Sequence, residues 1–286
     1  DCEVILHLYD KFGTNGFKEL DGEYAFILFN CSNDNIIICR DPFGVRPLYL
    51  YNDNKILLTS SVLSSMIHDN FITKYIEQFK PGTYSIYKYH EYTNNIEELE
   101  KYVNYTNVYE SYAPEKIHYD RLYELLKESI YKRITTSERP VCCLLSGGLD
   151  SSIVCAISSE YYHSINKTLE TFSIGMKDSE DYYYAKKVSD FIGSKHTHVE
   201  YDEQTFIDSI PEVIKDIESF DTTTVRASVG NWLIGKYIKE NTDFKVILNG
   251  DGADELMGGY LYFNAAPNNE DFDQECRRLL KNIHYF

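Results

Sequence analysis

Residues 141–152, VCCLLSGGLDSS, decide the fold of the C-terminal part of this chain. An apolar segment runs directly into Gly147 and Gly148, and Asp150 and Ser151 follow. Glycine lets a backbone approach an anion closely, and the first N–H groups of a helix point toward such an anion. An acidic residue at a phosphate site is expected where a divalent metal binds. The stretch therefore predicts a strand, a phosphate-binding loop and a helix.

Two other interpretations of this loop were considered. It could be a phosphate-binding motif of another known class, or it could be a turn that binds no ligand. The sequence contains no Walker loop and no dinucleotide fingerprint after a strand, which excludes those two classes. A serine-capped helix behind a glycine turn is the alternative that involves no ligand.

The segments around the loop alternate between apolar and amphipathic patterns. Helices are expected over residues 119–134, 151–162, 181–192, 205–217 and 227–240. Strands are expected over residues 141–145, 171–174, 198–201 and 245–248. This alternation is typical of a doubly wound parallel sheet, which binds ligands at the carboxyl ends of its strands.

Two further stretches carry residues suited to phosphate or metal. Residues 249–255, NGDGADE, follow a predicted strand and can supply oxygen ligands to Mg²⁺, although alone they could form a solvated acidic turn. Residues 220–228, FDTTTVRAS, precede a predicted helix, where threonines can cap the helix and Arg226 can meet an anion. An ordinary cap with a surface arginine is the alternative for the second stretch.

The N-terminal part is predicted to consist mainly of antiparallel β-structure. Strands rich in aliphatic and aromatic residues are expected over residues 23–31, 35–40, 48–51, 55–60 and 82–87. Helices are expected near residues 2–13 and 60–69. Residues 91–114 lack a clear periodicity and are interpreted as a connector between two domains.

Composition limits the classes of partner. The chain has 286 residues, with 28 Lys and Arg against 45 Asp and Glu, which gives a net charge of −17. An acidic surface repels phosphate backbones and anionic lipids, so we expect no nucleic-acid or membrane partner. The odd number of cysteines, without a CxxC pair, predicts free thiols in a reduced, cytoplasmic compartment. His196 and His198 lack an evident third metal ligand and are interpreted as ordinary polar residues.

The motifs resemble known families. SGGLDSS resembles the pyrophosphate loop of the N-type ATP pyrophosphatases, the PP-loop family. LLSGGLDSS, TTVRAS and NGDGADE with GGY together resemble the glutamine-hydrolysing asparagine synthetases, although Asn249 replaces the usual Ser and Asp251 replaces a Glu of many relatives. LDGEYAFILF at 20–29 and RDPFGVRPLYL at 40–50 resemble the second half of a class II glutaminase domain.

The resemblance implies a fold that is α/β and α+β. Residues 1–106 would form part of a glutaminase domain of the N-terminal-nucleophile fold, an antiparallel β sandwich with helices. Residues 107–286 would form a doubly wound, parallel-sheet PP-loop domain. The implied reaction is ATP-dependent amidation of L-aspartate with ammonia from L-glutamine, through a β-aspartyl-adenylate, with AMP and pyrophosphate released.

The resemblance also implies the site residues. ATP and pyrophosphate would be bound by Leu144, Leu145, Ser146, Gly147, Gly148, Asp150, Ser151, Ile174, Asn249 and Gly250. Catalytic roles are implied for Asp251, Arg226 and Thr223, and Mg²⁺ binding for Asp150 and Asp254. Asp1 would bind the amino group of glutamine.

The resemblance further implies that the chain is an internal fragment, because the nucleophilic Cys of such glutaminases lies upstream of the segment that matches DCEVI. Cys2 is then expected to be a buried helix residue. A homodimer is one assembly that the resemblance allows. A β-lactam synthetase, another amide-forming relative and a non-catalytic nucleotide-binding module remain the alternatives.

Overall fold

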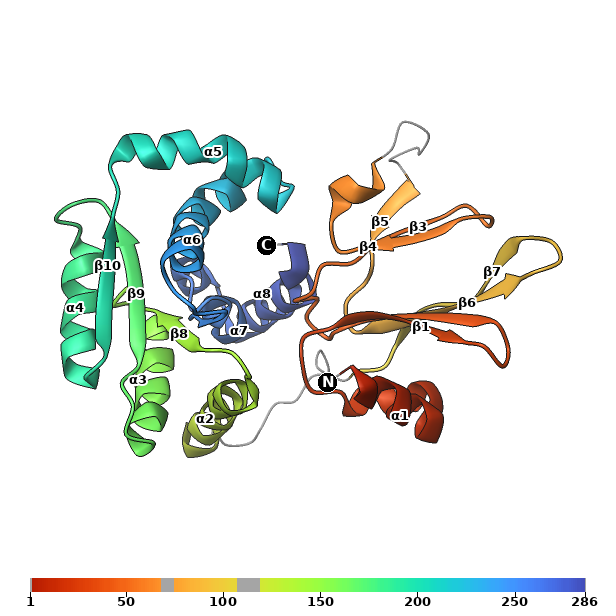
Figure 1. Cartoon of the computed structure of the whole chain (residues 1–286), viewed down its shortest axis with the longest axis horizontal. Helices are drawn as coiled ribbons and strands as arrows, with labels where there is room; N and C mark the ends of the chain where they lie inside the picture. Colours follow the sequence, from red (N-terminus) through yellow and green to blue (C-terminus); the bar gives the residue numbers. More distant parts are fainter. Residues whose placement is uncertain (1, 68–74, 107–118, 286) are drawn as a thin grey trace. The chain divides into compact units, whose positions relative to one another are not determined.

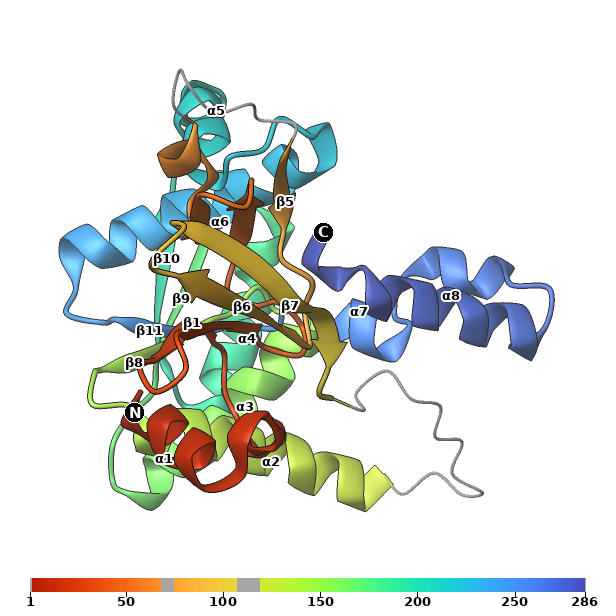
Figure 2. The same cartoon turned by 90° about the vertical axis from the view of Figure 1, so that its right-hand side faces the viewer.

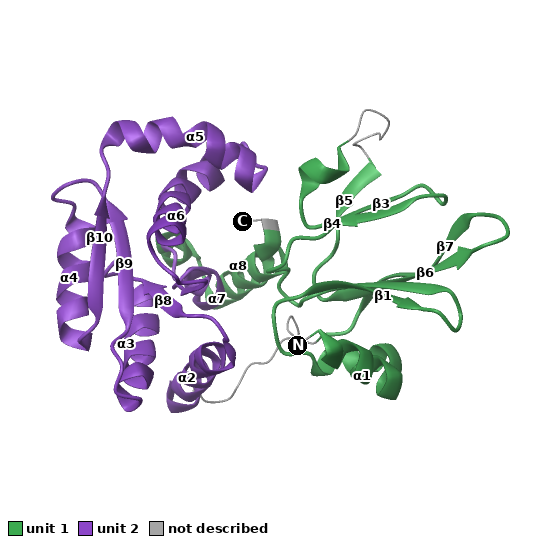
Figure 3. Cartoon of the chain, viewed as in Figure 1, with its two compact units in different colours: residues 1–112, 261–286 green, residues 113–260 purple. Residues whose placement is uncertain are grey.

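The computed structural model describes residues 2–67, 75–106 and 119–285, which fall into two compact units (Figure 3). Unit 1 comprises Asp1–Tyr112 with Leu261–Phe286, and unit 2 comprises Ala113–Tyr260. The expected domain limits differ in assigning the last 26 residues to the second domain, and they stay a prediction. The expected boundary after residue 106 adjoins residues 107–118, which lie outside the described residues.

Unit 2 is built on the predicted parallel sheet. Its strands are β8 (Val141–Leu144), β9 (Glu170–Gly175), β10 (Lys195–Glu200) and β11 (Val246–Leu248), in the order β10-β9-β8-β11. All three pairings are parallel. From β8 the chain adds β9 and then β10 on one side, whereas β11 is added on the opposite side of β8. The strand order therefore reverses between β8 and β11, and parallel sheets of this kind bind ligands at such a point.

Helices cover both faces of this sheet (Figure 1). On one face lie α2 (Tyr119–Thr136), α3 (Leu149–Ser164) and α4 (Glu180–Ile192), whereas α6 (Thr222–Asn241) covers the other face and contacts α5 (Glu203–Ile217). The central strand β8 is therefore buried from both sides. Its Cys143 packs into the α3 cluster and Cys142 into the α6 cluster, as an apolar central strand requires.

Unit 1 contains the two predicted antiparallel sheets. One has the order β1-β2-β6-β7, from the strands Ala25–Asn30, Asn35–Arg40, Thr83–His90 and Asn95–Asn104. The other has the order β4-β3-β5, from the strands Leu57–Ser60, Tyr49–Asn52 and Ile76–Gln78.

The two sheets of unit 1 pack face to face through a shared core. Ile38 of β2 and Leu50 of β3 belong to one buried cluster. The helix α1 (Glu3–Phe12) lies on the other face of the first sheet (Figure 2). There Phe17 lies in a second buried cluster together with side chains of α1. A short 3-10 helix, Gly13–Glu19, carries Phe17. The resulting order of layers is helix, sheet and sheet.

The last part of the chain is helical. It comprises α7 (Ala253–Met257) and α8 (Asn269–Lys281), with 3-10 turns at Leu261–Ala265 and Ile283–Tyr285. Among the described residues, no helix combines the length and the apolar character that a membrane span needs. All seven cysteines are free, as predicted.

Three sequence-based expectations for unit 1 were wrong. The segment over residues 91–114, expected to be a connector, contains β7. The alternation of apolar and polar residues that marks a strand is hidden in β7, because its register with β6 shifts and because Tyr102 has a positive φ of 52°. The helix expected near residues 60–69 is a single 3-10 turn, Leu63–Met66, within the described residues. Cys2 is exposed rather than buried, because it precedes the first residue of α1, a helix in which no residue is buried.

Candidate active site

The glycine loop between β8 and α3 is held in a shape that only glycine fits at its centre. Gly147 has a φ of +86°, a region that favours glycine. A Cβ at this position would lie 2.5 Å from Tyr184 Cβ and 2.6 Å from the backbone N of Ala185, both on α4. The loop therefore closes directly against α4.

Several N–H groups of this loop are available to a ligand. The amides of Ser146 and Gly148 donate long hydrogen bonds of 3.3 Å to the hydroxyls of Ser151 and Ser146. Four further N–H groups have no acceptor within the described part of the chain, namely those of Gly147, Leu149, Asp150 and Ser151. Unpaired donors at the start of a helix form an anion-binding site.

The second acidic loop lies in contact with the first. A Cβ at Gly250 would lie 2.7 Å from the backbone N of Ser151 and 2.8 Å from the backbone C of Asp150. Because β11 and β8 are neighbours, their following loops meet at one edge of the sheet. The structure thus brings Asn249 and Gly250 to the start of α3, as the predicted site requires.

The carboxylates at this edge repel one another. Desolvation, followed by the charges of Asp150 and Glu255, raises the pKa of Asp254 above its ordinary value. Asp251 accepts a 2.6 Å hydrogen bond from Asn249 Nδ2, and desolvation and the charge of Glu255 raise the pKa of Asp251. A cation would relieve this repulsion, and carboxylate oxygens are the donors that Mg²⁺ prefers.

The described residues contain no group of three or more His, Cys, Asp or Glu side chains arranged to hold a metal alone. Mg²⁺ is commonly bound by one or two carboxylates, with water and substrate phosphates completing its shell. Asp150 and Asp254 fit this pattern beside the loop amides.

Thr223 and Arg226 lie in the first two turns of α6, and both are exposed. The expectation that threonines cap this helix was wrong, because Asp221 is the cap and accepts a 2.9 Å hydrogen bond from the N–H of Thr224. Among described residues, no hydrogen bond or ion pair joins Thr223 or Arg226 to either loop. Asp1, the predicted glutamine-binding residue, lies outside the described residues.

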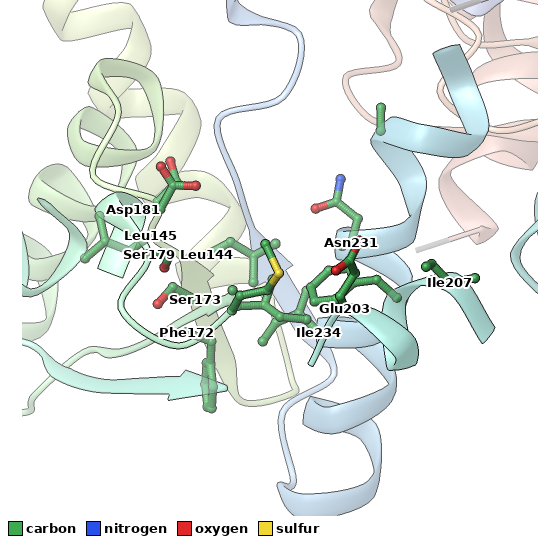
Figure 4. A pocket seen from close by; sticks show the side chains of 17 residues that line it. Leu144, Leu145, Phe172, Ser173, Ser179, Asp181, Glu203, Ile207, Asn231 and Ile234 are labelled. Carbon is green, nitrogen blue, oxygen red and sulfur yellow. The ribbon is translucent and has the colours of Figure 1, made fainter. Parts of the chain in front are cut away.

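A pocket of about 520 Å³ opens beside the glycine loop, between the ends of β8 and β9 and the helices α5 and α6 (Figure 4). It is lined by the predicted residues Leu144, Leu145, Ser146 and Ile174. Sequence reasoning missed its opposite wall, which includes Phe206, Ala227, Gly230, Asn231 and Ile234. The sequence feature that could have indicated this wall is the pair of small residues Ala227 and Gly230. They lie three positions apart on one helix face and leave room for a pocket beside it.

The two histidines form part of a chain of hydrogen-bonded polar side chains along β9 and β10. Thr171 Oγ1 lies 3.0 Å from His196 Nδ1, and Ser173 Oγ lies 2.9 Å from His196 Nε2. Ser173 Oγ also lies 2.7 Å from His198 Nδ1. The interpretation of these histidines as ordinary polar residues agrees with this geometry.

Stability should fall at acidic pH because of His196. Burial first, and then the charges of His198 and Lys186, lower the pKa of His196 from 6.5 to about 4. Between these values the unfolded chain binds the proton more tightly, so acidification from pH 7 to pH 5 costs on the order of 1–2 kcal/mol. Urea unfolding at pH 7 and pH 5 measures this loss, which His196→Gln should reduce. An equal loss in that variant would contradict the assignment.

Gly250→Ala should separate the two loops. The added methyl meets backbone atoms of Asp150 and Ser151, so we expect a loss of about 1–3 kcal/mol in the free energy of unfolding and weaker ATP binding. Gly235→Ala is the matched control, because a Cβ there meets nothing within 4 Å on α6 and should stabilise by about 0.5–1 kcal/mol. Chemical denaturation and calorimetry measure both effects, and a fully stable Gly250→Ala variant would contradict the contact.

Comparisons with known proteins match two family models to consecutive parts of the chain. Residues 121–284 match the family model for asparagine synthase, and residues 1–111 match the model for a glutamine amidotransferase domain. The chain is 40% identical over 308 residues to the glutamine-hydrolyzing asparagine synthetase of Rattus norvegicus, and 38% identical over 307 residues to that of Homo sapiens. Each alignment covers 100% of this chain and 54% of the relative, so the chain spans about half the length of these relatives.

Among solved structures, the NH3-dependent NAD synthetase of Campylobacter jejuni aligns over 50% of this chain and 61% of its own chain. The TM-score of this alignment is 0.36 and the sequence identity is 16%.

Proposed function

This chain belongs to the asparagine synthase family, and we propose that it forms the ATP-binding part of an enzyme that amidates L-aspartate to L-asparagine. The nitrogen would come from L-glutamine, hydrolysed with the help of unit 1, where residues 1–111 match a glutamine amidotransferase domain. The proposed reaction forms a β-aspartyl-adenylate and releases AMP and pyrophosphate.

The observation that carries the proposal is the continuity of an apolar pocket with an anion-binding loop. Ser146 belongs to both, since it lines the pocket and begins the loop. A nucleoside in the pocket, between Leu144 and Ile174, would direct its phosphates toward the free amides at the start of α3. Apolar walls with a few placed polar groups are typical of small-molecule sites.

Activation of aspartate requires that charge developing on the departing pyrophosphate be stabilised. The N–H groups of Gly147, Leu149 and Asp150 are fixed in place before any reaction, which is the arrangement that stabilises such charge most effectively. Mg²⁺ held by Asp150 and Asp254 would neutralise phosphate charge. Ser146, Gly148 and Ser151 would complete the loop that holds pyrophosphate.

The roles of the remaining predicted residues are also proposals. Asn249, Gly250 and Asp251 lie beside the start of α3 and would border the nucleotide and the acyl-adenylate. Thr223 and Arg226 would stabilise phosphate charge, and Asp1 would bind glutamine. A cytoplasmic location is proposed from the seven free cysteines. Assembly as a homodimer is also proposed, and it is tested by measuring the mass in solution.

The test is the exchange of labelled pyrophosphate into ATP by the full-length protein. We expect exchange that requires both Mg²⁺ and aspartate, and asparagine formation when glutamine or ammonium is added. Glutamate in place of aspartate is the matched control, since it carries the same carboxylate one methylene further away. Exchange that proceeds equally without aspartate would overturn the assignment of the substrate.

A further inference from the structure

The phosphate loop rests directly on the backbone of α4. A Cβ at Gly147 would lie 2.6 Å from the backbone N of Ala185 and 2.6 Å from the backbone C of Tyr184. Ala185 is fully buried and packs in the same cluster as Leu145, the residue before the loop. Because packed backbone atoms cannot turn away as a flexible side chain can, the position of α4 determines the position of the loop.

Polar and aromatic contacts attach α4 to β9 and β10 on both sides of the segment that touches the loop (Figure 1). After that segment, Ser189 Oγ accepts a 2.9 Å hydrogen bond from Ser194 Oγ, which lies 3.1 Å from Thr171 Oγ1 on β9. Before it, the ring of Tyr182 stacks on the ring of His198 on β10. The ring centroids are 4.5 Å apart and the planes are inclined by 30°.

Hydrogen bonds to β9 hold His198 in place. Its Nδ1 lies 2.7 Å from Ser173 Oγ, and this oxygen lies 2.9 Å from Nε2 of His196. Burial lowers the pKa of His198, so its imidazole is uncharged at neutral pH. An uncharged ring that is fixed from the sheet can support a second aromatic ring, here that of Tyr182.

The first turn of α4 depends on this stack because its other attachments are weak. The buried residues of α4 are Ala185, Ser189 and Ile192, so they begin only at the contact with the loop. The cap is Ser179, whose Oγ accepts a hydrogen bond of 3.4 Å from the N–H of Tyr182, which is long for such a bond.

We propose that Tyr182 and His198 are positioning residues for the phosphate loop; this inference rests on the proposed function. Their stacked rings fix the first turn of α4, and α4 fixes Gly147 together with the neighbouring loop amides. A loop that is fixed before ATP arrives loses less freedom on binding, so the triphosphate binds more tightly. Among the residues described, neither Tyr182 nor His198 lines the apolar pocket, so the nucleoside gains nothing from the stack.

The test measures the binding of ATP with Mg²⁺ and of adenosine to the full-length protein by calorimetry. The Kd of adenosine divided by that of ATP reports what the phosphates contribute, and a general loss of stability does not change it. Tyr182→Leu should lower this ratio about threefold to tenfold, the range expected for an aromatic pair. Tyr182→Phe keeps the ring and should restore the ratio. Phe191→Leu removes a 90% exposed ring from the same helix and is the matched control that should leave the ratio unchanged.

Two variants of His198 separate the stack from the hydrogen bond to Ser173. His198→Phe keeps a ring without the hydrogen bond and should resemble the wild type. His198→Gln keeps a polar group without the ring and should resemble Tyr182→Leu. The double variant of Tyr182→Leu and His198→Gln should lower the ratio no further than either single change, because each change alone already removes the stack.

Two results would overturn this inference and leave the proposed function intact. An unchanged ratio in Tyr182→Leu, with ATP and adenosine weakened alike or not at all, would show that the stack does not position the loop. Losses that add up in the double variant would show that the two rings act separately. A wild type that binds ATP no more tightly than adenosine would instead overturn both proposals.

Discussion

Asp150→Asn is expected to lower the aspartate-dependent exchange of pyrophosphate into ATP by about a hundredfold to a thousandfold. Asp150 lies in the first turn of α3, at the point where Gly250 of the second loop touches that helix. Asparagine keeps the shape of the side chain but removes the charge that would hold Mg²⁺ beside the phosphates. The exchange rate at several Mg²⁺ concentrations measures the effect, and high Mg²⁺ should restore part of it.

A second measurement on this variant is independent of activity. The charge of Asp150 helps to raise the pKa of Asp254, so the pKa of Asp254 should fall toward its ordinary value in Asp150→Asn. NMR titration of the Asp254 carboxyl reports this change. Asp243→Asn, at an exposed position between α6 and β11, removes the same charge and should alter neither measurement. Undiminished exchange in Asp150→Asn would refute the metal assignment.

The phosphate loop could be predicted from sequence because its determinants are local. Apolar residues from Val141 to Leu145 specify a buried strand, and the glycines that follow specify a turn. The meeting of Gly250 with Asp150 was a weaker inference, since it depends on β11 adding beside β8. It followed from the general rule that carboxyl ends of parallel strands share one edge.

The far wall of the pocket could not be predicted because nothing local marks it. Glu203, Phe206 and Asn231 come together only because α5 packs on α6 and α6 covers β9. A similar limit applies to β7, where one buried residue, Ile96, is followed by exposed acidic side chains on an edge strand. The alternation that would reveal a strand is too weak there to distinguish it from a solvated segment.

Arg40→Met is expected to lower the free energy of unfolding by about 3–5 kcal/mol through unit 1. The side chain of Arg40 ends β2 and is 1% exposed. Its guanidinium donates three hydrogen bonds of 2.7 Å, to the carbonyl oxygens of Arg46, Phe79 and Gly44. Methionine fills a similar volume but donates nothing, so three carbonyls at this corner lose a charged donor.

The neighbouring geometry leaves little room for relief at this corner. A Cβ at Gly44 would already lie 2.9 Å from Arg40 Cζ, so the loop is folded tightly around the guanidinium. The neighbouring Asp41 is also 1% exposed, and its carboxylate accepts hydrogen bonds from the N–H groups of Phe43, Val45 and Arg46. These hydrogen bonds hold the carboxylate in place, so it cannot shift to compensate for the loss of the guanidinium. Arg40→Lys should give an intermediate loss, because one ammonium cannot reach three carbonyls that a planar guanidinium fork serves.

Amide hydrogen exchange in β2 and β6 reports the stability of unit 1 separately from that of unit 2. Arg277→Met is the matched control for Arg40→Met, since Arg277 pairs with Asp273 on the surface of α8 and should cost less than about 1 kcal/mol. A loss in Arg40→Met no larger than in Arg277→Met would mean that water replaces the guanidinium. In that case the buried arginine would not be what holds this corner of the glutaminase-like unit together.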